Sequence, residues 1–278
     1  ITSIRKNGGE IYSAKENDGL YYGVLTDRSI LTFDRIYDFA VNTPIERLRE
    51  VFTPQIEDNI RIAEEGLTGK YGVGIGTSLI ANDKSSAAKI KAYAASASEA
   101  RMSGCTLPVI TNSGSGNQGI AASIPVIVYA REHGITGDKL YRALALSNLL
   151  TIYQKTFIGR LSAFCGAVSA AAASGGAITY LAGGDLSQIK MTLVNALANV
   201  SGIVCDGAKA SCGAKISAAL DAALTGHYLA MDRKFYQPHT GILQSDIDET
   251  ISAVGRMAME GMRDTDKVIL KIMLGESL

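Results

Sequence analysis

A stretch of 24 residues without a charged side chain, Leu161–Gly184, constrains the fold of this chain more than any other feature. A helix of that length would be long enough to span a membrane. Most of its residues are Ala, Gly and Ser, however, and few of its side chains are strongly apolar. We therefore predict a buried helix that packs through small residues, in a protein without membrane association.

The composition favours packed helices over a β-sandwich. Of the 278 residues, 47% are hydrophobic, only 6% are aromatic, and Trp is absent. Lys and Arg number 27, as do Asp and Glu, so the formal net charge is zero. This balance gives no reason to expect a nucleic-acid partner or binding to an acidic membrane surface. Because no leader segment is visible, we expect a cytoplasmic protein.

We predict a mainly α fold, a multi-helix domain with a small N-terminal β-ribbon. The ribbon would pair the β-prone runs Glu10–Ala14 and Tyr21–Thr26 across the turn-rich residues between them. A two-stranded ribbon is only marginally stable by itself. Residues 1–40 are therefore predicted to be the end of a missing N-terminal domain, and residues 41–278 the helical domain.

Helix signals begin near residue 43. Thr43-Pro44-Ile45-Glu46 indicates a capping box with Pro in the first helical position. Thr53-Pro54 indicates a second helix start, and Gly66 a stop. Gly72–Gly76 is a glycine-rich loop. Further helices are predicted over residues 84–102, 120–133, 137–158, 160–182, 185–201, 208–230 and 245–274.

Two cysteines near residue 208 indicate a metal site. Cys205 and Cys212 would lie about 10 Å apart along the axis of one continuous helix, which is long for two ligands of one small cluster. Asp206-Gly207 should interrupt that helix, with Asp206 capping a helix that starts near Ala208. Cys205 then lies just before the helix and Cys212 about one turn inside it. The positive end of the helix favours thiolate over thiol.

A third cysteine, Cys165, precedes Gly166, which lets a ligand or backbone approach closely. Three thiolates, from Cys165, Cys205 and Cys212, leave one position of an iron centre open for substrate. Zinc also suits three thiolates, and free cysteines are commonly small buried hydrophobes. Cys105 lies outside these segments, so we expect it to be structural.

A polar loop forms the second candidate site. Alternating glycines and small polar residues expose backbone N–H groups beside side-chain donors, so a loop leading into a helix can hold a carboxylate or phosphate. The loop lacks the lysine of a P-loop, and an ordinary polar connection between helices is the alternative reading. The candidate substrate-binding residues are Asn112, Ser113, Gly114, Ser115, Gly116, Asn117 and Gln118.

Taken in order, four segments resemble the iron–sulfur serine dehydratase alpha-chain family, in particular its cysteine desulfidase branch. The resemblance extends over nearly the whole chain, and the ordered combination is more specific than any one motif. The segments are Ala100–Met102, Thr106–Pro108, Asn112–Gly119 and Ser201–Ala208.

The resemblance implies a [4Fe–4S] cluster held by cysteines, which match Cys165, Cys205 and Cys212 by position, and no pyridoxal phosphate. The Asn112–Gly119 loop is similar to the part that receives the carboxylate of a small amino-acid substrate. The implied reaction is α,β-elimination of L-serine or L-cysteine to pyruvate and ammonia, carried out by the helical domain 41–278. The general base is not identified.

Members of this branch usually carry a further N-terminal region with a Gly-Cys-Thr-Glu-Pro motif, which does not occur in this sequence. We therefore expect a separate or cleaved N-terminal segment as a partner, and a homodimer is a further possibility. Two other functions stay open. One is a non-catalytic fragment or amino-acid-binding module, and the other is a zinc-thiolate protein.

Overall fold

The computed structural model describes residues 3–13, 27–159 and 162–276. The chain divides into two compact units, Ile1–Ile30 and Leu31–Leu278. Helices dominate the described residues, which confirms the predicted mainly α fold with a small β-ribbon near the N-terminus. The role of residues 1–40 as the end of a separate domain stays a prediction.

The first unit contains a two-stranded antiparallel ribbon of β1 (Ser3–Lys6) and β2 (Gly9–Ser13). Asn7 and Gly8 connect the strands with φ angles of 51° and 79°, as a tight Asn-Gly hairpin turn requires. The strand expected over residues 10–14 therefore pairs with residues that precede it. The other expected strand, Tyr21–Thr26, lies outside the described residues.

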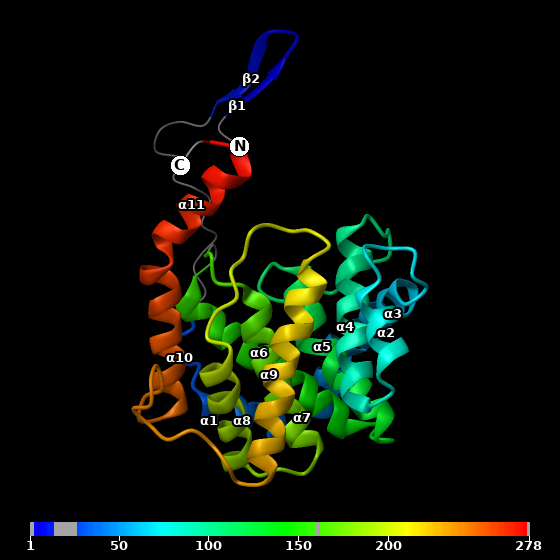
Figure 1. The fold of residues 1–278 in the computed structure, drawn as a ribbon, viewed down its shortest axis with the longest axis vertical. Coiled ribbons are helices and arrows are strands. Elements are labelled where there is room, and N and C mark those ends of the chain that lie inside the picture. Colours follow the sequence, from blue (N-terminus) through cyan, green and yellow to red (C-terminus); the bar gives the residue numbers. More distant parts are fainter. Residues whose placement is uncertain (1–2, 14–26, 160–161, 277–278) are drawn as a thin grey trace. The chain divides into compact units, whose positions relative to one another are not determined.

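The second unit consists of helices (Figure 1). They are α1 (Phe33–Asn42), α2 (Ile45–Gly66), α3 (Ile75–Asn82), α4 (Ser86–Met102), α5 (Gly116–Glu132), α6 (Asp138–Ile158), α7 (Gly166–Leu181), α8 (Leu186–Asn199), α9 (Cys212–Met231), α10 (Ile247–Arg256) and α11 (Arg263–Leu274), with a short π-helix, η1 (Met257–Gly261), between the last two.

Helix α2 corrects two predictions. It begins at Ile45 without a side-chain cap, so the predicted capping box at Thr43 does not form. It then runs unbroken to Gly66 with Pro54 inside it, so no second helix starts there. The helix continues through the proline because Leu48 and Phe52 before it are buried on the same side as residues beyond it, and this packing outweighs the lost backbone hydrogen bond.

Three other elements differ from the prediction. Helix α1 makes the chain helical from Phe33 rather than residue 43, and α3 follows directly on the glycine-rich loop. The single helix expected over residues 245–274 is broken at η1 into α10 and α11. The remaining predicted helices are present with shifted ends.

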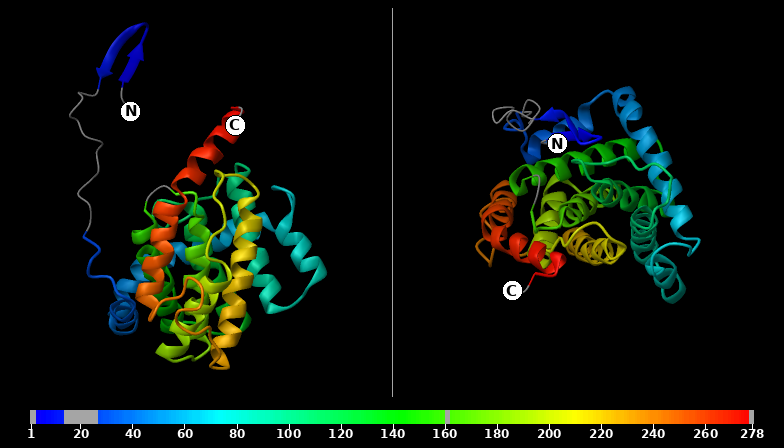
Figure 2. Two further views of the ribbon diagram at one scale, coloured as in Figure 1. Left: turned by 60° about the vertical axis from the view of Figure 1, so that its left-hand side comes forward. Right: turned by 90° about the horizontal axis from the view of Figure 1, so that it is seen from above.

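Helix α7 confirms the buried helix expected in the uncharged stretch. Its side chains are nearly all shielded from solvent, and it contacts α5, α6, α8 and α9. Seen from above in Figure 2, these green and yellow helices lie side by side in the core. A Cβ atom on Gly175 would come within 3.0 Å of the Ala223 Cβ, so glycine is what lets α9 approach. Within the described part of the chain, we find no helix with the length and apolar character needed to cross a membrane.

Helices α5, α7 and α9 run parallel. Gly175 of α7 packs on Ala223 of α9. One turn further along both helices, Thr179 Oγ1 lies 2.9 Å from His227 Nδ1. The ring of Tyr129, near the end of α5, also lies against His227, with 6.1 Å between centroids. The three helices therefore begin at one end of the bundle, which is the upper end in Figure 1.

Helix α4 runs the other way and ends where the others begin. Lys91 forms a 2.7 Å ion pair with Asp221 in the middle of α9. Further along α4, the carbonyl of Ala95 lies 2.9 Å from where a Cβ of Gly213 would be, at the start of α9. The upper end of the bundle thus gathers three helix N-termini and the C-terminus of α4.

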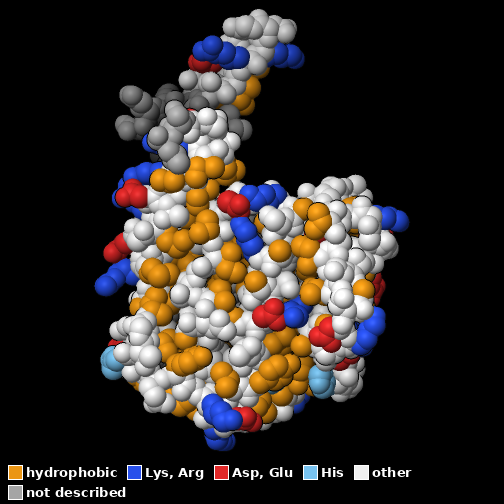
Figure 3. Space-filling model, viewed as in Figure 1, with side chains coloured by type: hydrophobic (Ala, Val, Ile, Leu, Met, Phe, Trp, Pro, Cys, Tyr) orange, Lys and Arg blue, Asp and Glu red, His pale blue; other side chains and the backbone are white. Residues whose placement is uncertain are grey.

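Charged groups are mixed over the surface. On the face shown in Figure 3, basic and acidic side chains are interspersed rather than separated by sign. Several pair across helices, such as Lys89 with Glu132 at 2.7 Å. This mixing agrees with the zero net charge and leaves no extended field of one sign on that face.

We predict that Gly175→Val lowers the free energy of unfolding by about 1–3 kcal/mol, because the added methyl groups would overpack the contact with Ala223. Urea unfolding measures the change. Gly261→Val is the control, because a Cβ atom there meets nothing closer than 3.9 Å. Equal loss in both variants would contradict the close packing of α7 on α9.

The buried His227 predicts a pH dependence of stability. Burial lowers the pKa of His227 from its ordinary 6.5 to about 4, and the nearby His133 adds to this. Between these values the unfolded state binds more protons, so stability falls as the pH drops from 6.5 towards 4. The loss is on the order of 3 kcal/mol. Urea unfolding across this range should show the free energy of unfolding falling with pH in the wild type and falling less in His227→Gln. Equal slopes in the two proteins would contradict the role of His227.

Candidate metal and substrate site

Two of the three predicted metal ligands lie side by side. Phe164 and Val204 form an isolated antiparallel bridge, flanked by backbone hydrogen bonds of 2.8 and 2.6 Å from the N–H groups of Cys165 and Cys205. Because side chains alternate along extended backbone, both cysteines point to the same side of this bridge. The fold thus joins residues that are 40 positions apart in the sequence.

The two thiols differ in proton affinity. A hydrogen bond from Cys165, with help from the Gly207 N–H and Lys215, lowers the pKa of Cys205 to about 6. The same bond to Cys205, together with burial, raises the pKa of Cys165 well above its usual range. Cys205 is therefore the thiolate of the pair at neutral pH, and Cys165 holds the proton.

The segment after Cys205 differs from the prediction. Helix α9 begins at Cys212, so Cys212 is its first residue rather than one turn inside, and Ser211 rather than Asp206 occupies the capping position. Asp206 instead forms ion pairs with Lys209 and Lys215, which lower the pKa of its carboxyl to about 2. Two lysines compete for this carboxylate, and that pairing outweighs capping of the helix.

Cys212 lies at the same end of the bundle but is not joined to the pair. Its Sγ is 3.7 Å from the carbonyl oxygen of Gly207, and its charge acts on Cys165 without a hydrogen bond between them. Within residues 3–13, 27–159 and 162–276, no three Cys, His, Asp or Glu side chains are close enough together to hold a metal ion. The ligand set of three therefore stays a prediction.

The predicted substrate loop is a tight turn at the start of α5. Asn112 and Ser115 exchange backbone hydrogen bonds of 3.1 and 2.9 Å, and Ser113 and Gly114 between them have positive φ angles. The Asn112 amide is buried and donates to Asn148 of α6 at 3.0 Å. Asn112 therefore anchors the loop through a side chain directed into the protein, and its predicted role in substrate binding stays a prediction.

Gln118 links this loop to the cysteines. A Cβ atom on Gly166 would lie 2.6 Å from the Gln118 Cδ and Nε2 atoms, so the amide rests on the backbone next to Cys165. Gln118 is only 7% exposed, and its Oε1 is buried without a hydrogen-bond partner in the described structure. A buried oxygen in that state indicates a place for a ligand or water.

Two further cations lie at this end, and the sequence analysis assigned neither a role. Lys155 is in the last turn of α6, 9% exposed; burial lowers the pKa of its ammonium, opposed by the attraction of Cys205 and Cys165. Lys155 is the only charged residue between Arg142 and Arg160, and this isolation was the signal that could have identified it. Arg101, at the end of α4, lies against Gly116; it belongs to the segment Ala100–Met102 that resembles the family, which was the signal that could have identified it.

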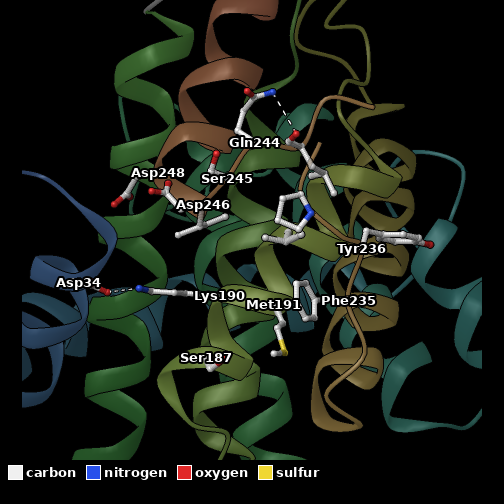
Figure 4. A pocket seen from close by; sticks show the side chains of 14 residues that line it. Asp34, Ser187, Lys190, Met191, Phe235, Tyr236, Gln244, Ser245, Asp246 and Asp248 are labelled. Carbon is white, nitrogen blue, oxygen red and sulfur yellow. Dashed lines mark hydrogen bonds and ion pairs between the residues drawn. The ribbon is translucent and has the colours of Figure 1, made fainter. Parts of the chain in front are cut away.

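A separate pocket of about 310 Å³ lies elsewhere in the helical unit (Figure 4). Lys190 and Met191 of α8 form one wall, and the segment from Phe235 to Asp248 forms the other. Lys190 points to Asp34, with which it forms a 2.6 Å ion pair. None of the predicted site residues lines this pocket, so it is not part of the cysteine site.

Comparison with known families assigns the chain to one of them. Residues 20–271 match the family described as the serine dehydratase alpha chain. Because the match covers most of the chain, the chain belongs to the serine dehydratase alpha chain family, a family named for a lyase. The resemblance of the four sequence segments to this family is thereby confirmed.

Relatives in this family are longer than the chain and are named only as UPF0597 proteins. The one from Treponema denticola is 48% identical over 99% of the chain and 65% of its own length. Those from Lachnoclostridium phytofermentans and Desulfitobacterium hafniense are 51% and 48% identical, over 89% and 99% of the chain and 60% and 64% of their own lengths. The chain thus spans less than two thirds of these relatives, and no solved structure matches it.

The two thiol pKa values predict unequal reactivity in the metal-free chain. Because the thiolate is the reactive form, iodoacetamide should modify Cys205 half-maximally near pH 6 and leave Cys165 unmodified. Cys165→Ala removes the hydrogen bond and should move the midpoint for Cys205 upward. Peptide mass spectrometry measures both. A wild-type midpoint near pH 8.5, the ordinary value for a thiol, would contradict the pairing.

Proposed function

We propose that this chain carries most of the active site of an ammonia-lyase that converts L-serine or L-cysteine to pyruvate and ammonia. The observation that carries the proposal is the pairing of the Cys165 and Cys205 thiols at the upper end of the bundle, where the Gln118 amide rests on Gly166 next to Cys165. Membership of the serine dehydratase alpha chain family supports this reaction class.

We propose Cys165, Cys205 and Cys212 as ligands of a [4Fe–4S] cluster. The donors suit a cluster chemically, because the hydrogen bond from Cys165 lowers the pKa of Cys205 to about 6 and Cys212 stands at the positive end of a helix. Lys155 and Lys215 add positive charge close to the thiolates. Bound there, such a cluster supplies an open iron that acts as a Lewis acid on the leaving group.

The residues of the chain then hold the amino acid. The Gln118 amide, buried and with an unused oxygen, is placed to bind a polar group of the substrate beside Cys165. The turn at Ser113 and the start of α5 offer backbone N–H groups to an anion. Burial of the Gln118 amide strengthens its hydrogen bond to a polar group of the ligand.

The elimination balances without a redox partner. The Cα–H bond breaks and its electron pair forms the Cα=Cβ bond, while the Cβ–O or Cβ–S bond breaks and the leaving group departs as water or hydrogen sulfide. The aminoacrylate so formed tautomerises to an imine, which water hydrolyses to pyruvate and ammonia. L-Serine and L-cysteine are equal candidates as the substrate, because both carry the same carboxylate and ammonium groups.

Iron and acid-labile sulfide in anaerobically purified chain test the proposal. We expect about four irons per chain, lost in Cys165→Ser and Cys205→Ser. Cys105→Ser is the matched control, because the Cys105 side chain pairs with Tyr71 rather than with either thiol of the pair; it should keep its iron. Pyruvate and ammonia released from L-serine and L-cysteine measure the activity.

The other outcomes identify the alternatives. One zinc per chain in place of iron, lost in the same variants, would mean a zinc-thiolate protein. Binding of an amino acid without iron and without pyruvate would mean a non-catalytic binding module. Either result would overturn the proposal of an iron–sulfur lyase. Iron retained in both Cys165→Ser and Cys205→Ser would overturn it as well.

A further inference from the structure

We propose that the pocket between α8 and the segment from Phe235 to Asp248 binds a small organic cation, an amine whose ammonium group is carried on an apolar body. The proposal goes beyond the lyase and does not rest on it, because none of the residues assigned to the lyase lines this pocket. Three features carry it: a wall fixed by buried hydrogen bonds, an apolar lining, and negative charge without a basic partner.

The wall opposite α8 is held in place at both ends. Asn195 of α8 is 2% exposed. Its Nδ2 donates to the carbonyl of Lys234 at 3.0 Å, and its Oδ1 accepts from the Tyr236 N–H at 3.1 Å. At the other end, the Gln244 N–H donates to Thr250 Oγ1 of α10 at 3.0 Å. The pocket is therefore preformed, and its volume of about 310 Å³ is in the range of small-molecule sites.

The lining of the pocket is mainly apolar. Apolar side chains come from both walls, namely Met191, Val194, Phe235, Pro238, Leu243 and Ile247. Phe235 still exposes 37% of its surface. A ligand with an apolar body would remove such surface from water, and this burial favours binding.

The charged groups of the lining are unequal in number. The carboxylates of Asp34, Asp246 and Asp248 line the pocket together with one ammonium, that of Lys190. Lys190 is already paired with Asp34 at 2.6 Å, and Figure 4 shows it pointing towards that residue. Two negative charges of the lining, those of Asp246 and Asp248, are therefore left over.

The partners of these two carboxylates are neutral. Asp248 accepts hydrogen bonds from the Phe33 N–H, at 3.0 Å, and from the Tyr153 hydroxyl. Asp246 Oδ1 accepts from the Glu249 N–H at 2.8 Å and caps α10. Among the residues that the structure describes, neither carboxylate forms an ion pair, whereas Asp34 does. Neutral donors leave the charge uncompensated, so a cation entering the pocket would be attracted to both groups.

The same groups argue against two other kinds of ligand. In the described parts of the chain, no three Cys, His, Asp or Glu side chains lie close enough together to hold a metal ion, so these carboxylates do not form a metal site. A carboxylate or phosphate would need an available cation, and the ammonium of Lys190 is occupied by Asp34. The matching ligand is therefore an amine without an acid group, rather than an amino acid.

Titration calorimetry with three ligands of similar shape tests the proposal. At neutral pH 2-phenylethylamine is a cation, 2-phenylethanol is neutral and phenylacetate is an anion. We expect the chain to bind the amine at one site, at least about fivefold more tightly than the alcohol, because a half-exposed ion pair contributes about that much. Phenylacetate should bind more weakly than the alcohol. In about 1 M salt, where charges are screened, the preference for the amine should shrink.

Isosteric variants locate the site. Asp246→Asn and Asp248→Asn each remove one charge and keep an oxygen that accepts the backbone N–H, so α10 keeps its cap. Each should lose part of the preference for the amine, and the double variant most of it. Asp264→Asn is the matched control, because Asp264 lies on α11 and pairs with Lys267; it should keep the full preference. Val194→Phe fills the pocket and should weaken binding of both the amine and the alcohol.

Urea unfolding shows which variants are folded, and Asp246→Asn decides the test if Asp248→Asn is not, because Asp246 is exposed. A wild type that binds no amine or binds the alcohol equally well would overturn the proposal. An unchanged preference in every folded Asp246 and Asp248 variant would overturn it too.

The test is distinguishable from that of the lyase. If the wild type prefers the amine through Asp246 and Asp248 but holds no iron and forms no pyruvate, the cation pocket stands and the lyase fails. If the wild type forms pyruvate but does not prefer the amine, the lyase stands and the cation pocket fails.

Discussion

The close packing of α7 against its neighbours is the constraint on which the rest of the structure depends. Because α7 presents mainly Ala, Gly and Ser to α5, α6, α8 and α9, those helices pack closely against it. The contacts of Gly175 with Ala223 and of Thr179 with His227 fix α9 parallel to α7. That direction brings Cys165 and Cys212, which stand at the starts of these two helices, to one end of the bundle.

Parallel helices give this end its chemical character. The starts of α5, α7 and α9 each direct partial positive charge towards it, and Lys155 and Lys215 add full charges. Thiolates are stabilised in such a field, and an anionic substrate group is too. The same arrangement therefore favours metal ligation by cysteine and binding of a carboxylate, the two functions that an iron-dependent amino-acid lyase needs in one place.

The sequence predicted much of the fold but only part of the site. Helical periodicity and composition placed most helices and the burial of α7, because these depend on local preference and apolar pattern. Asp206 was misassigned as a cap, because its pairing with Lys209 and Lys215 is not visible in local sequence. The meeting of Cys165 with Cys205 depends on a tertiary backbone bridge, which no periodicity predicts.

Four buried side-chain oxygens lack a hydrogen-bond partner among the described residues, and two of them lie at the upper end of the bundle. Oε1 of Gln118 and Oγ of Ser169, in the first turn of α7, are buried without a hydrogen bond among the described residues. At the start of α8, by contrast, Asp185 and Gln188 form a complete capping box. A buried group without a partner costs stability of about 1–3 kcal/mol. A ligand that completes a hydrogen bond offsets that cost. Gln118 Oε1 differs from the Ser86 and Ser96 oxygens on α4 because it lies beside the backbone that precedes α7, next to Cys165, and it is therefore the oxygen that the proposed substrate site would use.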